Sequence, residues 1–324
     1  MASKELEHDT ILCSPSLPQT TARRWWTEET VAVVTGANKG IGFAIVKRLA
    51  ELGLTVVLTA RNEEKGLEAV ENLKRNNGIS SVRFCILDVS DPSSISKFAS
   101  WFKHNFVALD ILINNAAVTF NDVDNEKTAE VTAEQAEEVM RTNFYGPKLL
   151  IEALLPCFRW GSPSFVRILN VTSRLGLLNK LKNPKLRKML VDEQLSEDQI
   201  QGMVEMFLEN VKNGTWKNQG WPEIWTEYAV SKLALNAFSM VLAKRFKLKG
   251  IGGSCHGLGL GVSVNCYCPG FTQTCMTGGK GKYSADDAAQ VAAMLALIPP
   301  NQLPTGKFFL RHDPPNSATI SSKL

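Results

Sequence analysis

The sequence lacks the patterns that identify several large classes of protein. Its seven cysteines include no CxxC pair and its four histidines are scattered, so we expect reduced thiols and no metal site. No apolar run approaches the roughly 18 residues that a membrane span requires. The net charge of the 324 residues is only +4, with basic residues dispersed among acidic ones. We therefore expect neither a membrane nor a nucleic acid as a partner.

The two ends of the chain differ from its middle. Residues 1–29 and 313–324 are polar and show no periodicity, so we expect a flexible N-terminal arm and a flexible C-terminal tail. The arm contains acidic residues and no apolar core, which argues against a transit or signal peptide. The tail ends in Ser322-Lys323-Leu324, a peroxisomal import signal, and predicts a location in the peroxisome. A cytosolic location is the alternative.

Between residues 30 and 312, apolar strand-like runs alternate with amphipathic helix-like segments. Continuous apolar strands separated by helices indicate a sheet covered on both faces. We therefore predict a single α/β domain of the doubly wound Rossmann type, with a mainly parallel sheet of seven strands. Ligands in such sheets bind beyond the carboxyl ends of the strands, so the residues that follow each strand are the candidate site residues.

A glycine-rich turn, "TGANKGIG", follows the first expected strand. Glycine allows a tight turn and a close approach of pyrophosphate to a helix N-terminus, where free N–H groups favour an anion. Between a first strand and a first helix, this pattern is typical of a dinucleotide site. The turn supplies six candidate cofactor-binding residues: Gly36, Asn38, Lys39, Gly40, Ile41 and Gly42.

The end of the second strand discriminates between the two nicotinamide cofactors. An acid at this position would bond the ribose hydroxyls and repel a 2′-phosphate. Here Arg61 occupies the position and Lys39 lies in the glycine turn, so two cations favour NADPH/NADP⁺. Pairing of Arg61 with Glu63 or Glu64 at the surface is the alternative interpretation.

The third and fourth strands are also followed by candidate cofactor residues. Asp88 and Val89 follow the third strand and are placed to contact the adenine edge. Asn115 lies in "NNAA" (114–117) after the fourth strand, where small residues would let the backbone approach the cofactor ribose.

Six short motifs occur in order over residues 30–310: TGxxxGIG, NNAA, the asparagine of "MRTNFYG", a serine after the fifth strand, YxxxK and a closing PG. Together they resemble the short-chain dehydrogenase/reductase family. The resemblance implies an oxidoreductase that moves a hydride between a nicotinamide cofactor and a carbonyl or alcohol carbon.

The resemblance also implies roles for the matching residues. Tyr228 would protonate the carbonyl oxygen, and Lys232 would hold the nicotinamide ribose and lower the tyrosine pKa from near 10. Four residues apart on a helix, the two side chains would share a face. Ser173 would polarise the substrate oxygen, and Asn143 would hold a helix and a water. After the sixth strand, Thr272 and Thr274 match positions that face the carboxamide and phosphates, and Pro269 and Gly270, which precede them, are also candidate cofactor-binding residues.

An insert of about residues 177–222 separates Ser173 from Tyr228. It contains a predicted amphipathic helix and resembles the monomeric plant and animal carbonyl reductases of the family, which implies a monomer. The insert contains Trp216 and Trp221, and Trp225 follows it. These three side chains either line an apolar substrate pocket or anchor the insert on the core. The Gly-rich loop 250–261 suggests no function.

We therefore expect an NADPH-dependent reductase of an aldehyde or ketone, or the reverse alcohol oxidation. The substrate would be an apolar small molecule of terpenoid, aromatic or lipid-derived type. A catalytically silent NADP(H)-binding regulatory protein is the alternative, although the presence of all four expected catalytic residues argues against it.

Overall fold

The structure, a computed structural model, describes residues 10–13, 24–121, 130–160, 165–249, 261–299 and 302–311. The signal Ser322-Lys323-Leu324, the C-terminal tail, most of the N-terminal arm and all but the last residue of the Gly-rich loop lie outside these ranges. Within them, no helix combines the length and apolar character of a membrane span. No group of His, Cys, Asp and Glu in the same ranges is arranged to hold a metal ion.

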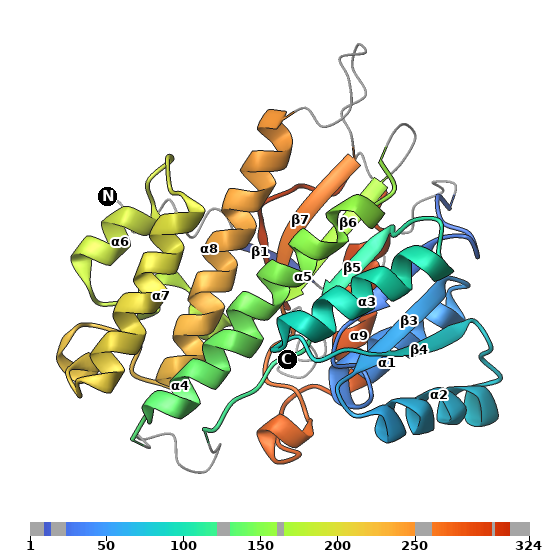
Figure 1. The fold of residues 1–324 in the computed structure, drawn as a ribbon, viewed down its shortest axis with the longest axis horizontal. Coiled ribbons are helices and arrows are strands. Elements are labelled where there is room, and N and C mark those ends of the chain that lie inside the picture. Colours follow the sequence, from blue (N-terminus) through green and yellow to red (C-terminus); the bar gives the residue numbers. More distant parts are fainter. Residues whose placement is uncertain are drawn as a thin grey trace, which may run out of the picture.

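A parallel sheet forms the centre of the molecule (Figure 1). Its strands lie in the order β1-β8-β7-β6-β5-β2-β3-β4, and every neighbouring pair is parallel. Their bounds are β1 Thr10–Cys13, β2 Val31–Val34, β3 Thr55–Ala60, β4 Val82–Ile86, β5 Ile111–Asn114, β6 Phe165–Val171, β7 Gly261–Cys268 and β8 Phe308–Arg311. The predicted doubly wound α/β fold is confirmed.

The sheet has eight strands, so the prediction of seven was wrong. The additional strand β1 comes from the N-terminal arm and pairs with β8, Thr10 opposite Phe308. The end of the arm is also anchored, because the indole N–H groups of Trp25 and Trp26 donate to the Leu297 and Leu52 carbonyls over 3.0 and 3.2 Å. The expectation of a flexible arm therefore fails for Thr10–Cys13 and for residues 24–29.

Helices cover both faces of the sheet (Figure 1). Strand residues alternate between the two core clusters, with Val31 and Val33 in one and Ala32 and Val34 in the other. The first cluster packs under α3 (Pro92–Asn105), α4 (Ala133–Met140), α5 (Gly146–Leu154) and α8 (Thr226–Lys249). The second packs under α1 (Gly40–Glu51), α2 (Glu63–Asn77) and α9 (Ala285–Leu297).

The predicted insert folds as two helices, α6 (Pro184–Leu190) and α7 (Glu197–Lys212), on the left in Figure 1. A capping box begins α7, in which Ser196 accepts from the Gln199 N–H and the Gln199 side chain accepts in return. The buried face of α7 packs against α4 and α8, so the insert covers part of both helices.

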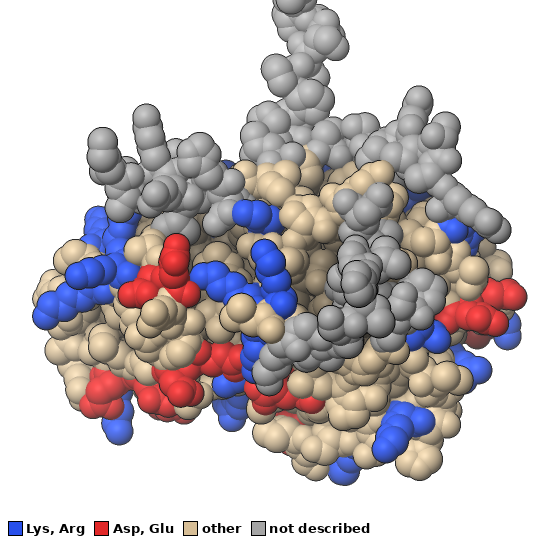
Figure 2. All heavy atoms as spheres, turned by 90° about the horizontal axis from the view of Figure 1, so that it is seen from above, with Lys and Arg blue, Asp and Glu red and all other residues tan. Residues whose placement is uncertain are grey.

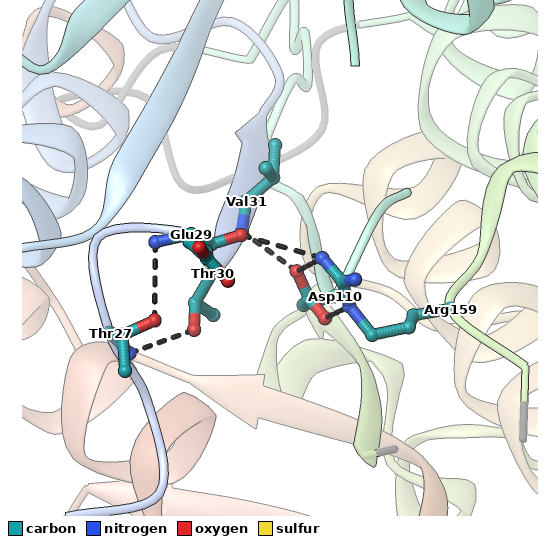
Figure 3. Close-up of polar contacts among 6 residues, drawn as sticks. All are labelled: Thr27, Glu29, Thr30, Val31, Asp110 and Arg159. Atoms are coloured by element: carbon teal, nitrogen blue, oxygen red, sulfur yellow. Dashed lines mark hydrogen bonds and ion pairs between the residues drawn. The ribbon is translucent and has the colours of Figure 1, made fainter. Parts of the chain in front are cut away.

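The start of β2 is held by a buried carboxylate (Figure 3). Asp110 accepts from the Val31 N–H over 2.8 Å and from Arg159 Nε over 2.6 Å, and this bond raises the pKa of Arg159. A turn in which the Thr27 N–H donates to Thr30 Oγ1 leads into the strand. This network lies at the opposite end of β2 from the glycine turn, and we assign it a structural role. The face in Figure 2, on the side where β7 begins, carries basic and acidic side chains interspersed.

Candidate active site

The carboxyl ends of the central strands enclose a cleft of about 1220 Å³, its open mouth included. These ends point downward in Figure 1. Of the sixteen predicted cofactor residues, thirteen line the cleft: Gly36, Asn38, Lys39, Gly40, Ile41, Arg61, Asp88, Val89, Asn115, Tyr228, Lys232, Pro269 and Thr274. Residues predicted from separate sequence motifs therefore line the same cleft in the folded chain.

The glycine turn packs directly on the segment after β5. Gly36 has a φ of +61°, and a Cβ there would lie 2.8 Å from the Ala116 Cα. The Asn115 side-chain amide donates to the Thr35 and Gly36 carbonyls over 2.9 and 3.2 Å. Gly42 does not line the cleft, but a Cβ there would lie 2.5 Å from this amide nitrogen. Gly36 and Gly42 are thus required for close packing of the turn.

The N-terminus of α1 opens into the same cleft and suits an anion. Its N-cap residue, Lys39, makes no side-chain capping bond, and the first turn contains no acidic residue. The N–H groups of this turn are therefore available to a phosphate group. An uncapped helix end beside a glycine turn fits the pyrophosphate of a dinucleotide.

Arg61 and Lys39 are exposed at the edge of the cleft. Within the described part of the chain, Arg61 forms no ion pair with Glu63 or Glu64. Surface pairing, the alternative explanation for this arginine, is therefore not observed. Both cations are free to meet a ligand that carries an additional phosphate.

Asn143 lies outside the cleft and is fully buried in a π-helical turn, Arg141–Tyr145, between α4 and α5. Its Oδ1 accepts from the Val118 N–H over 2.8 Å, and its Nδ2 donates to the Val118 carbonyl over 2.9 Å and to Ser231 Oγ over 3.1 Å. Ser231 Oγ in turn donates to the Tyr228 carbonyl over 2.7 Å. Asn143 therefore connects the wall of the cleft to helix α8.

Tyr228 and Lys232 share one face of α8 and both line the cleft. Tyr228 is 9 % exposed and Lys232 only 2 %. The Lys232 ammonium donates to the Val171 carbonyl over 3.0 Å and lies 5.4 Å from the centre of the Tyr228 ring. The predicted common face of the pair is confirmed.

Burial controls the protonation of this pair. It raises the pKa of the Tyr228 phenol above its usual value and lowers the pKa of Lys232 to about 8. We expected the ammonium to lower the tyrosine pKa; instead the loss of hydration, with a smaller contribution from Cys268, raises it. Tyr228 is consequently a neutral phenol at pH 7 and holds the proton that a general acid must donate.

Three further predicted residues lie off the cleft lining. Ser173 follows the lining residue Thr172, and its Oγ accepts from the Leu175 N–H over 3.1 Å. Gly270, with a φ of +77°, and Thr272, whose hydroxyl bonds the Gly270 carbonyl over 3.3 Å, form the turn after β7. These two residues shape the turn that brings Pro269 and Thr274 to the cleft.

Sequence reasoning missed several residues that line the cleft. They are Leu87, Val118, Thr142, Val171, Thr172, Cys275 and Met276. Most are immediate neighbours of predicted residues at strand ends. Their place in the sequence, rather than their residue type, could therefore have identified them. Thr142 had a weaker signal of the same kind, since it precedes Asn143.

The three tryptophans divide between the two roles that the sequence left open. Trp216 and Trp221 are buried in the core, where Trp221 packs 5.2 Å from Phe207 and donates to the Asn210 side chain over 3.0 Å. Trp225 is half-buried, and its ring meets that of Tyr228 edge to face with 5.8 Å between centres. The first two anchor the insert, whereas the third contacts Tyr228.

A dinucleotide-type anion site and a buried tyrosine–lysine pair in one cleft define an oxidoreductase with a nicotinamide cofactor. Comparison with known proteins agrees, because the model for short chain dehydrogenases matches residues 30–184. The (+)-neomenthol dehydrogenase of Arabidopsis thaliana is 39 % identical over 297 residues, which cover 86 % of this chain and 95 % of that protein.

Two further similarities extend over nearly the same length. Carbonyl reductase [NADPH] 1 of Mus musculus is 35 % identical over 282 residues, 86 % of this chain and 95 % of that protein. The solved structure of salutaridine reductase from Papaver somniferum superposes with a TM-score of 0.76 at 36 % identity, covering 87 % of this chain and 99 % of that one. The chain belongs to the short-chain dehydrogenase/reductase family, and it is an oxidoreductase acting on CH–OH or C=O groups.

The buried lysine predicts a pH dependence of stability. Between the lowered Lys232 pKa of about 8 and the usual value of 10.5, the unfolded chain binds a proton that the folded protein has lost, so stability rises with pH in this window. We compare the unfolding free energy of the wild type with that of Lys232→Met. The difference, wild type minus variant, should increase by about 2 kcal/mol between pH 7 and roughly pH 9.5. Urea unfolding at several pH values measures it, and two parallel curves would show that the Lys232 pKa is not lowered.

Proposed function

We propose that the protein is an NADPH-dependent carbonyl reductase, which reduces an aldehyde or ketone or catalyses the reverse alcohol oxidation. The observation that carries this proposal is the position of Tyr228 and Lys232, buried in the same cleft as the glycine turn and Arg61. A proton donor and a dinucleotide site that share one cleft are what carbonyl reduction requires.

The chemistry assigned to the chain is proton delivery and charge stabilisation. When bound, NADPH supplies the hydride to the carbonyl carbon. Tyr228 donates its phenolic proton to the carbonyl oxygen, so the C=O double bond becomes a C–O single bond as one C–H and one O–H bond form. The nearby Lys232 ammonium, held by the Val171 carbonyl, stabilises the phenolate that remains. The Ser173 hydroxyl, whose proton is not used by its bond from Leu175, would donate to the substrate oxygen.

Arg61 and Lys39 support NADPH rather than NADH as the cofactor. Both are cationic and exposed at the cleft, where Arg61 directly follows β3 and Lys39 lies in the glycine turn. The mouse relative named above carries NADPH in its name. A 2′-phosphate is the group that would give both cations a partner.

An apolar substrate of terpenoid, aromatic or lipid-derived type suits the chain. Two relatives are named for reactions of neomenthol and salutaridine. The residues that line the cleft include Val118 and Met276, whose side chains are apolar. The alternative, a silent NADP(H)-binding regulator, does not explain why the protein buries both a phenol and an ammonium in its cleft.

Removal of one oxygen atom tests the mechanism. Tyr228→Phe should lower NADPH-dependent reduction of aldehydes and ketones at least roughly 100-fold, because phenylalanine lacks the phenolic proton that the carbonyl oxygen receives. NADPH consumption with a panel of terpenoid and aromatic carbonyl compounds measures the effect. NADPH binding, followed by calorimetry, should be nearly unchanged. Turnover that survives the substitution would refute the role of Tyr228, and a wild type that binds NADPH but reduces no compound would favour the regulator.

The cofactor preference depends on Arg61 in this proposal. Arg61→Ala should weaken NADPH binding by roughly 10- to 100-fold and leave NADH binding within about threefold, because only the 2′-phosphate loses a charge-assisted contact. Arg75→Ala, at the other end of α2, is the matched control and should change neither affinity. Equal losses of affinity for NADPH and NADH would show that Arg61 does not contact the 2′-phosphate.

We also propose that the protein is a monomer. Family resemblance places subunit contacts on the long helix that begins with α4 and continues into α5, and on α8; here α7 packs against α4 and α8. Light scattering after gel filtration at micromolar concentration should give the mass of one chain, 35.7 kDa. A mass of twice that value would contradict the proposal.

A further inference from the structure

The backbone of Trp225 is in a conformation that tryptophan rarely adopts. Among the described residues it is the only one other than glycine with a positive φ, 50°. It immediately precedes α8, and its carbonyl accepts the first helical bond, from the Ala229 N–H over 2.7 Å. A left-handed conformation is disfavoured for any residue with a Cβ, and glycine or asparagine would adopt it more readily. The start of the helix therefore gives no reason for a tryptophan here.

The indole of Trp225 also differs from the anchoring tryptophans in its surroundings. Its ring stands at 82° to that of Tyr228, with 5.8 Å between centres. Trp225 is half-buried, and its indole N–H group has no hydrogen-bond partner among the described residues, whereas that of Trp221 bonds Asn210. An indole with a free surface beside the proton donor is available to a bound molecule.

The segment after β5 approaches the same end of α8. Its Asn121 donates to the buried Glu227 carboxylate, which follows Trp225 by two residues. Two large apolar side chains in these segments are exposed, Phe120 at 43 % and Ile224 at 47 %. Phe120 comes two residues after Val118, which lines the cleft, and Ile224 directly precedes Trp225, so the bond between Asn121 and Glu227 joins the two segments that carry these exposed side chains. A substrate whose carbonyl oxygen reaches Tyr228 would therefore lie next to these segments.

We propose that Trp225 is a specificity-determining residue, whose indole covers the flat face of a cyclic or aromatic ketone and holds its carbonyl at Tyr228. The inference rests on the proposed carbonyl reductase function and adds the substrate shape. An indole provides a large, rigid apolar surface at a small cost in conformational entropy. Backbone strain beside a catalytic group is retained where the side chain that it positions is needed.

A series of substitutions separates the ring from the backbone. Trp225→Gly and Trp225→Asn remove the indole with residues that suit a left-handed backbone, Trp225→Ala removes it with one that does not, and Trp225→Phe keeps an aromatic face. The measured quantity is the ratio of kcat/KM for a flat bicyclic aromatic ketone to that for a short aliphatic aldehyde. We expect this ratio to fall roughly 10-fold in the first three variants, chiefly through KM for the ketone, and to stay within about threefold in Trp225→Phe.

Thermal unfolding of the same variants is the control for structure. Trp225→Gly should unfold at a higher temperature than Trp225→Ala, because both lose the ring and only glycine relieves the backbone. A selectivity loss in Trp225→Ala that is absent from Trp225→Gly would assign the effect to the backbone and overturn the proposal. An equal loss for both substrates would also overturn it. A wild type inactive on every carbonyl compound would overturn the proposed function with it, whereas activity with an unchanged ratio would overturn the role of Trp225 alone.

Discussion

The geometry of the site depends on the buried amide of Asn143. It satisfies both backbone groups of Val118 and donates to Ser231, which bonds the carbonyl of Tyr228. A buried amide that lost one of these partners would leave polar groups unpaired, so the arrangement is formed as a whole or not at all. The π-helical turn brings this side chain to the interior, and it thereby links the segment after β5 to the helix that carries the proton donor.

A second constraint is the burial of two polar groups at the reacting end of the cleft. The fold lowers the pKa of Lys232 and raises that of Tyr228, which opposes both ionised forms. Among the residues that the structure describes, the Val171 carbonyl alone accepts a hydrogen bond from the ammonium and compensates for its burial. Such a site destabilises the folded protein at neutral pH, yet it holds a neutral phenol beside a cation until a negative charge develops on the phenol oxygen. The same desolvation that costs stability strengthens that interaction.

The parts of the fold and site that depend on residues close together in the sequence could be predicted from the sequence. Buried strands, the glycine turn and the spacing of Tyr228 and Lys232 each lie within a few residues, and the structure brings them to one cleft. Strand β1 escaped prediction because four residues show no periodicity and their partner, β8, is at the other end of the chain. The tryptophans were ambiguous for a similar reason. Apolar spacing marks each of them as buried or partly buried, but only tertiary packing separates the anchors from Trp225.

The insert connects two properties that are usually considered separately. Its end is held where the Gly220 carbonyl accepts from the Lys182 and Asn183 N–H groups over 2.7 and 3.1 Å. Trp221 is then buried against α7, and only a short segment remains before α8 begins. That segment must turn sharply, and the turn falls on Trp225. The packing that covers α4 and α8 thus also sets the indole against Tyr228, so a change in the insert that exposed the helices would alter the substrate surface as well.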